Sequence, residues 1–154
     1  MDPAYKIPNI KWLSDNHVIA EHSRLGSYHL YFQTPEDLYF TDNETNIQLV
    51  KGEQQKSIFT KDAINNAIVA GKNKTQLRRR KYGTKCSPVY SVTLAAGASE
   101  DIFLRLSATN FESPFPQGFE SIFDKRKKEA DEFYTAILKN SNSASLHNMQ
   151  RQAL

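Results

Sequence analysis

Short runs of β-branched and aromatic residues occupy the first third of the chain, and turn-forming residues separate them. Residues 17–22 and 27–33 are two such runs, and Ser23-Arg24-Leu25-Gly26 between them is typical of a hairpin turn. A third run, residues 37–41, follows the turn-forming Thr34-Pro35-Glu36. The pattern predicts three strands.

Two later segments alternate between apolar and other residues, as strands buried on one face do. They span residues 89–94 and 102–106, and the small residues 95–99 form a turn between them. Together with the first three runs, these segments predict an antiparallel sheet or sandwich. The stretch 42–87 is less regular. We predict one short helix around residues 61–68 and a polar loop from Gly71 through Arg78-Arg79-Arg80-Lys81.

The pattern changes to a helical period near the C-terminus. From Phe119 the apolar residues repeat every 3.6 residues over about five turns; they are Phe119, Ile122, Phe123, Ala130, Phe133, Tyr134, Ile137 and Leu138. Charged residues fill the other face, and Asn140 with Ser141 ends the pattern. A second helix is expected from Ser143 or Ser145. It reaches Leu154 without a capping residue, which we take as a sign of a longer protein.

The predicted fold is therefore mainly β with C-terminal helices. We expect a partial antiparallel β-sandwich over residues 1–108, and a connector with a long amphipathic linker helix over residues 109–140. Residues 141–154 are expected to begin a further helical domain. This order of strands followed by helices is that of an α+β chain or of the junction between a β and an α domain.

Composition sets further bounds on the protein. Of its 154 residues, 39% are hydrophobic and 24% charged, which is typical of a globular chain. A net charge of +3 is too small to imply a polyanionic partner. We predict no membrane span, because no run approaches the ~18 apolar residues that a span requires. The single Cys86 and the absence of an apolar signal in residues 1–6 favour a cytoplasmic location.

No residue pattern indicates catalysis, a metal or a cofactor. Cys86 has no nucleophile signature around it and is expected to be half-buried at the start of a strand. The three histidines at positions 17, 22 and 29 lack metal-ligand spacing and are expected on a sheet surface. Many of the acidic residues lie in the turn 42–44 and on the solvent face of the long helix, so no acid–base pair is predicted.

Two polar segments deserve separate interpretations. The basic residues Lys72, Lys74, Arg78, Arg79, Arg80, Lys81 and Lys85 favour a solvated surface loop, with a phosphate-contacting patch as the alternative. The segment Phe40-Thr41-Asp42-Asn43-Glu44-Thr45-Asn46 places dense hydrogen-bonding groups at a strand end. Such groups either satisfy the backbone of a turn, which is favoured here, or bind sugar hydroxyls.

Several segments in order along the chain resemble the glucosidase-like proteins of glycoside hydrolase family 63. The most specific are Asn43-Glu44-Thr45-Asn46 and Ala130-Asp131-Glu132-Phe133-Tyr134. The others are residues 18–22 with Leu25-Gly26, 38–42, 61–66, 83–85, 104–107, 119–123, Arg126, Glu129 and 149–154. The run 78–81 and Cys86-Ser87-Pro88 depart from the family's pattern.

The resemblance implies a position inside a larger enzyme. In that family a β-sandwich domain is followed by a linker helix and by a toroid of paired helices, which carries the general acid and base of an inverting hydrolysis. The catalytic carboxylates would lie beyond Leu154. This chain would then be a non-catalytic part that supports the catalytic domain of its own parent chain, and it would meet carbohydrate only through that parent.

The expected roles of individual residues follow from this position. The candidates for a substrate groove are Asn43, Glu44, Asn46, Lys61 and Asp62. The linker helix would pack through Phe119, Phe123, Phe133, Tyr134 and Ile137. Two alternatives stay open: a stand-alone carbohydrate-binding module that uses the polar turn, and a small basic protein that binds nucleic acid, which the modest charge makes the weaker one.

Overall fold

A computed structural model describes residues 7–55, 57–138 and 143–153. The chain divides into two compact units, and the division falls between Pro114 and Phe115. This point lies inside the connector expected over residues 109–140. Each unit is described by itself.

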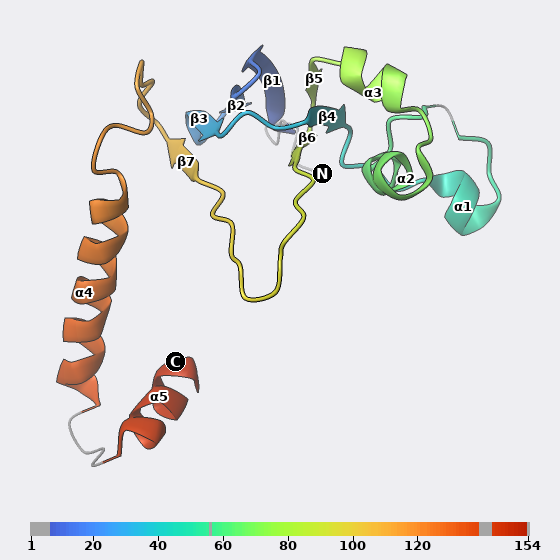
Figure 1. The fold of residues 1–154 in the computed structure, drawn as a ribbon. Helices are drawn as coiled ribbons and strands as arrows, with labels where there is room; N and C mark the ends of the chain where they lie inside the picture. Colours follow the sequence, from blue (N-terminus) through green and yellow to red (C-terminus); the bar gives the residue numbers. More distant parts are fainter. Residues whose placement is uncertain (1–6, 56, 139–142, 154) are drawn as a thin grey trace. The chain divides into compact units, whose positions relative to one another are not determined.

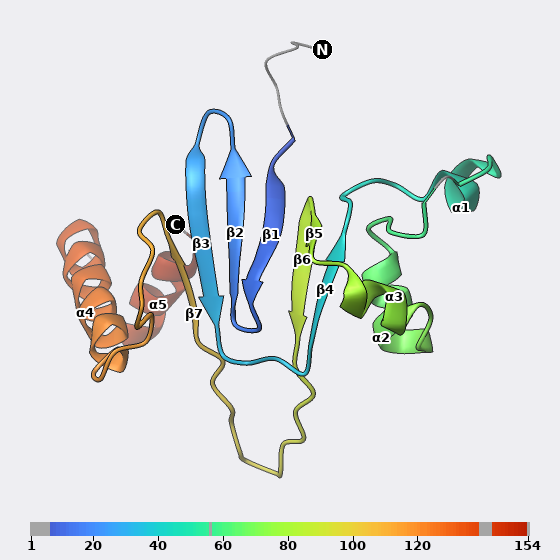
Figure 2. The ribbon, with the colours of Figure 1, turned by 90° about the horizontal axis from the view of Figure 1, so that it is seen from above.

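A five-stranded antiparallel sheet forms the centre of the first unit (Figures 1 and 2). Its spatial order is β5-β1-β2-β3-β7. The bounds of these strands are Asn9–Ser14 for β1, His17–His22 for β2, Gly26–Phe32 for β3, Tyr82–Gly83 for β5 and Leu104–Ser107 for β7. The hairpin expected around residues 23–26 is confirmed, since Ala20 of β2 lies opposite Tyr28 of β3. Strand β1 had no clear signal in the sequence.

A second sheet of two antiparallel strands consists of β4, Asp37–Thr41, and β6, Lys85–Val89. The strand expected over residues 89–94 is wrong, because β6 ends where its partner β4 begins: Val89 lies opposite Asp37. Residues 90–103 form a long loop without helix or strand (Figure 2). Alternation alone does not make a strand when no neighbouring strand can supply the backbone hydrogen bonds.

Three short helices connect β4 to β5: α1, Ile47–Lys51; α2, Ala63–Ala70; and α3, Lys74–Arg79. The helix expected around residues 61–68 is confirmed as α2. The polar loop expected from Gly71 to Lys81 is wrong, because α3 occupies most of it. A single apolar residue explains α3: Leu77 is completely buried against Tyr39 of β4 and Ala67 of α2. Burial of one leucine contributes about 1.5–3 kcal/mol, which fixes a helix that is otherwise polar.

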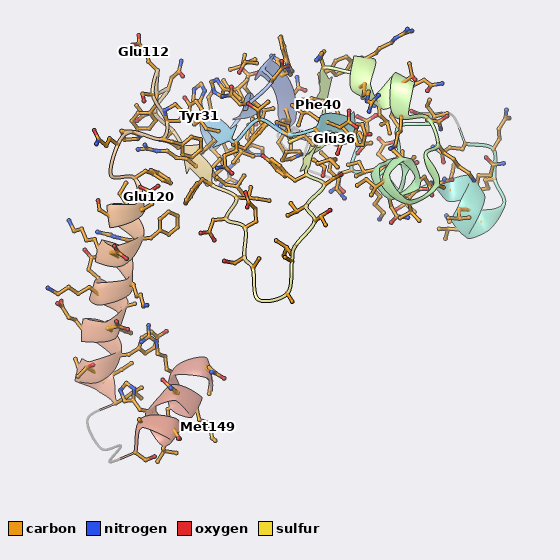
Figure 3. The ribbon with its side chains drawn as sticks, in the orientation of Figure 1. Tyr31, Glu36, Phe40, Glu112, Glu120 and Met149 are labelled. Carbon is orange, nitrogen blue, oxygen red and sulfur yellow. The ribbon has the colours of Figure 1, made fainter. Side chains whose placement is uncertain are left out.

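The two sheets meet around a second apolar cluster and a close backbone approach. Val18, Phe32 and Phe40 are almost fully buried together, and Trp12 packs against them; Phe40 is labelled in Figure 3. At Gly83 the backbone of β5 touches that of β4, since a Cβ built on this glycine would lie 2.4 Å from the Thr41 carbonyl oxygen. Only glycine fits there.

The second unit holds two helices, α4, Glu120–Ile137, and α5, Ala144–Ala153. Both predicted helices are confirmed. The expected end of the first helix at Asn140 and Ser141, and the boundary between residues 140 and 141, lie outside the described residues. Arg151 of α5 forms an ion pair with Asp131 of α4 and its guanidinium carbon lies 4.9 Å from the centre of the Tyr134 ring.

The apolar stripe of α4 is largely exposed. Phe119, just before the helix, is buried and packs edge-to-face against Phe115 and Phe123. Four other large side chains of the stripe are open to solvent, since Ile122, Phe123, Phe133 and Ile137 are 44%, 54%, 59% and 51% exposed. Tyr134 is half-buried. In the ranges that the structure describes, no helix has both the length and the apolar character needed to cross a membrane.

Candidate functional site

A polar pocket of about 240 Å³ lies beside α1 and α2. Amide, hydroxyl and charged side chains make up most of its wall. It is lined by Asn46, Gln48, Gln55, Ser57, Ile58, Thr60, Asp62, Ala63, Asn66, Lys72 and Asn73. Such a wall offers many hydrogen-bonding groups, which suits a ligand rich in hydroxyl groups.

The Asp62 carboxylate organises this pocket. Its Oδ1 accepts a hydrogen bond from the Thr60 hydroxyl at 2.6 Å, and its Oδ2 accepts from the amides of Asn46 at 3.0 Å and Asn66 at 3.3 Å. Burial acts to raise the pKa of Asp62, but the hydrogen bonds from Thr60, Asn46 and Asn66 outweigh it and hold the pKa below its ordinary value. Asp62 is therefore an ionised acceptor at neutral pH.

Hydrogen bonds from backbone amides hold two side chains of the pocket wall in place. The Asn46 side chain caps α1 by accepting a hydrogen bond from the Leu49 amide at 3.2 Å. The Gln55 side chain accepts from the Ile47 amide at 2.9 Å. Because these groups already have partners, the pocket is preformed. Its chemistry is that of hydrogen bonding, since a general acid needs a carboxyl group that holds a proton.

The five sequence-predicted groove residues separate into two groups. Asn46 and Asp62 line the pocket and contact each other. Asn43, Glu44 and Lys61 do not line it. Their backbone instead shapes the turn, since the Lys61 amide donates to the Glu44 carbonyl at 3.0 Å and the Asn43 amide donates to the Thr84 hydroxyl at 2.7 Å.

Sequence reasoning missed most of the pocket. Gln55, Thr60, Asn66 and Lys72 come from a stretch that reads as irregular and polar, and nothing in their order shows that they converge. The polar segment 40–46 and the family resemblance made Asn46 and Asp62 candidates. Of the two, only Asn46 caps a helix with its side chain. Only the packing of α2 and α3 against β4 brings the other side chains to the same place.

The basic run at residues 78–81 is not a solvated loop. Arg78 forms an ion pair with Asp37, and Arg80 donates to both carboxylate oxygens of Asp42 at 2.8 and 3.0 Å. The Arg80 side chain is only 11% exposed. Arg78 and Arg80 thus attach α3 to the two ends of β4, while Arg79 and Lys81 stay exposed.

The histidines also differ from expectation. His29 is buried rather than on the sheet surface, and its Nδ1 lies 2.9 Å from Nε2 of His17, whose ring stacks on Tyr31. Burial lowers the pKa of His17, and a charge on His29 lowers it further. No group of three or more metal-binding side chains occurs within the described residues. Cys86 is half-buried in β6, and burial raises the pKa of its thiol to about 11.

Comparison with known proteins gives one relative. A Saccharomyces cerevisiae protein described as uncharacterized protein YMR196W is 37% identical to this chain over 130 residues, a match that covers 75% of this chain and 12% of the yeast protein. The chain therefore spans only a small part of the length of this relative. No protein-family model matches the chain, and no solved structure does.

Proposed function

We propose that this chain is a non-catalytic β-rich module of a larger protein related to the glucosidase-like enzymes of glycoside hydrolase family 63. In this proposal the first unit is part of a β-sandwich, α4 is the linker helix, and α5 is the first helix of a catalytic toroid. The parent protein hydrolyses an O-glycosidic bond with inversion, and the module supports its catalytic domain.

The exposed stripe of α4 is the observation that carries the proposal. Four large apolar side chains, Ile122, Phe123, Phe133 and Ile137, recur at helical spacing and are each about half exposed. Leu146 and Met149 of α5 are also open, at 45% and 66%. An amphipathic helix gains most of its stability by covering such a stripe, so a further layer of protein is the natural occupant. The greater length of the yeast relative is consistent with such a layer.

The state of the carboxylates supports a non-catalytic role. Asp37 and Asp42 are paired with arginines, Asp131 is paired with Arg151, and Asp62 accepts three hydrogen bonds. A glycosidase requires one carboxyl group that keeps a proton near neutral pH. The hydrogen bond from Arg78 works against that requirement at Asp37, because it lowers the pKa of that carboxyl.

The experiment compares the 154-residue chain with the complete product of the reading frame that encodes it. Both are assayed for hydrolysis of α-glucosides, and the anomeric form of the product is followed by NMR. The proposal expects hydrolysis with inversion by the complete product and none by the chain alone. Hydrolysis by the chain alone would refute the non-catalytic role, and an inactive complete product would refute the relation to glycosidases.

The polar pocket favours a second candidate, carbohydrate binding by the chain itself. The test is affinity electrophoresis of the chain in gels that contain soluble glucans, with Lys72→Ala as the pocket variant. Lys85→Ala is the matched control, because Lys85 is an exposed lysine that does not line the pocket. Retardation that Lys72→Ala reduces and Lys85→Ala preserves supports this candidate. Equal mobility in all gels rejects it.

The ion pairs of Arg78 and Arg80 weigh against the nucleic-acid alternative. Two of the four cations in the run 78–81 are committed to Asp37 and Asp42, so fewer charges face a phosphate backbone. Binding to DNA or RNA that falls steeply with salt, and that is lost when the exposed Arg79 and Lys81 are neutralised, is the result that this alternative needs.

A further inference from the structure

A second hollow, of about 480 Å³, lies beside the C-terminal part of α3. It shares only Ser57 with the lining of the polar pocket beside α1 and α2. Its lining residues are Asp42, Ser57, Phe59, Gln76, Arg79, Arg80 and Tyr82.

Arg80 forms the base of this hollow. Its guanidinium carbon lies 4.5 Å from the centre of the Phe59 ring and 5.0 Å from that of the Tyr82 ring, so aromatic rings contact the cation. Asp42 binds only the Nη2 nitrogen, at 2.8 and 3.0 Å. The other terminal nitrogen, Nη1, is buried and has no hydrogen-bond partner among the described residues.

An unpartnered guanidinium nitrogen is costly, and ring contacts do not repair it. The N–H bonds of arginine lie in the guanidinium plane and need an acceptor in that plane, whereas a ring offers its face. A buried donor without an acceptor has lost its hydrogen bonds to water and gains none in return. An acceptor oxygen supplied by a ligand would remove this cost, so Nη1 favours binding of a group that carries such an oxygen.

The charges of the side chains around Nη1 indicate what kind of ligand group would bind there. Arg79 is exposed and has no ion-pair partner within the part of the chain that the structure describes. The hollow thus holds two arginine cations and one carboxylate, that of Asp42, which leaves a net positive charge. Gln76 adds an exposed amide, and Tyr82 is 60% exposed at the edge of the hollow. These groups favour an anion over a neutral or cationic ligand.

We propose that this hollow binds the oxyanion group of a small ligand, a carboxylate or a phosphate. One ligand oxygen accepts from Arg80 Nη1 while another meets the Arg79 guanidinium, and the exposed Tyr82 side chain moves aside to admit it. Asp42 stays on Nη2 and holds the Arg80 guanidinium in position.

The experiment titrates the ¹⁵N-labelled 154-residue chain with inorganic phosphate and with acetate at constant ionic strength, and follows backbone amide shifts by NMR. The two anions distinguish the phosphate from the carboxylate as the source. The proposal expects saturable shifts at Gln76, Arg79, Arg80 and Tyr82 with at least one of them. Arg79→Gln is expected to weaken binding about tenfold, the usual effect of losing one charge-assisted hydrogen bond.

Two further variants make the outcome decisive. Arg24→Gln removes an equally exposed arginine from the β2–β3 turn, and it should leave the affinity unchanged. Asp42→Asn should strengthen anion binding, because it removes the one negative charge among the lining residues while its amide oxygen can still accept from Arg80 Nη2. Unchanged anion affinity in this variant would count against the proposal. Shifts that do not saturate with either anion overturn the proposal. So does an equal loss of affinity in Arg79→Gln and Arg24→Gln, because binding would then follow net charge alone.

Discussion

Replacing Gly83 by alanine is expected to destabilise the first unit through a single backbone collision. The new Cβ would lie 2.4 Å from the Thr41 carbonyl oxygen, 3.1 Å from its carbonyl carbon and 3.2 Å from its nitrogen. All three are backbone atoms, so no side-chain rotation relieves the overlap. The strands must separate by roughly 1 Å before the atoms reach the ~3.5 Å that non-bonded atoms prefer.

The separation has a cost that can be worked out from the contacts. Overpacking of this kind costs about 1–3 kcal/mol. The same movement stretches the 3.0 Å hydrogen bond from the Thr84 amide to the Thr41 carbonyl, and loss of such a bond costs about 1 kcal/mol. Gly83→Ala should therefore lower the free energy of unfolding by about 2–4 kcal/mol, out of a total of about 5–15 kcal/mol for a typical domain.

Urea unfolding followed by Trp12 fluorescence measures this loss. Trp12 is the single tryptophan and packs against the Val18–Phe32–Phe40 cluster, so its emission reports on the first unit. The control is Gly97→Ala, where the added Cβ meets no atom within 4 Å but the backbone φ is +76°. That variant should lose only about 1–2 kcal/mol, the cost of a left-handed alanine. A loss in Gly83→Ala no larger than in the control would refute the collision argument.

Three further predictions concern ionisable groups. Because the pKa of His17 is lowered in the fold, the unfolded chain binds a proton at a higher pH than the folded chain does, and stability should fall as pH drops below about 6.5. Urea midpoints at neutral and mildly acidic pH measure this fall, and His17→Gln should reduce it. The pKa of Cys86 is raised to about 11 from 9.0, so its thiolate should be ~100-fold scarcer in the native chain than in the unfolded chain. A disulfide reagent should therefore label the native chain correspondingly slowly. Labelling at the rate of the urea-unfolded chain would contradict this prediction. The hydrogen bond from Arg78 lowers the pKa of Asp37, so Arg78→Gln should be less stable than the natural chain at neutral pH. This difference in stability should shrink as pH falls below about 3.8. A constant difference in acid titrations followed by circular dichroism would argue against the ion pair.

Local sequence was sufficient where one segment specifies its own structure. The hairpin of β2 and β3 has its turn residues between two β-forming runs, and α4 has an apolar stripe over its whole length. Helix α2 likewise has three buried residues, Ala63, Ile64 and Ala67, at helical spacing. In each case the period of the pattern matches the geometry of the element, so the prediction needs no partner from elsewhere in the chain.

Tertiary partners decided the remaining elements. Alternation over residues 89–94 predicts a strand, yet β6 ends at Val89 because β4 offers no residue beyond Asp37 to pair with. The basic run predicts an exposed loop. Burial of Leu77 and the two arginine–aspartate pairs instead place it at the C-terminal end of α3. These contacts join residues about 40 positions apart, as the pairs Arg78–Asp37 and Arg80–Asp42 do.

The sequence by itself thus determined a β-rich first part, an amphipathic helix after Phe119 and a shorter helix after it, because the periods of apolar residues are local properties. The polar segment 40–46 also made Asn46 a candidate, and Asp62 became one through the family resemblance. Only the tertiary structure decided that these two residues share a pocket with Gln55, Asn66 and Lys72, and that Arg80 lies between two rings with an unpartnered nitrogen. A pocket depends on which distant side chains converge, and that depends on packing rather than on the order of residues.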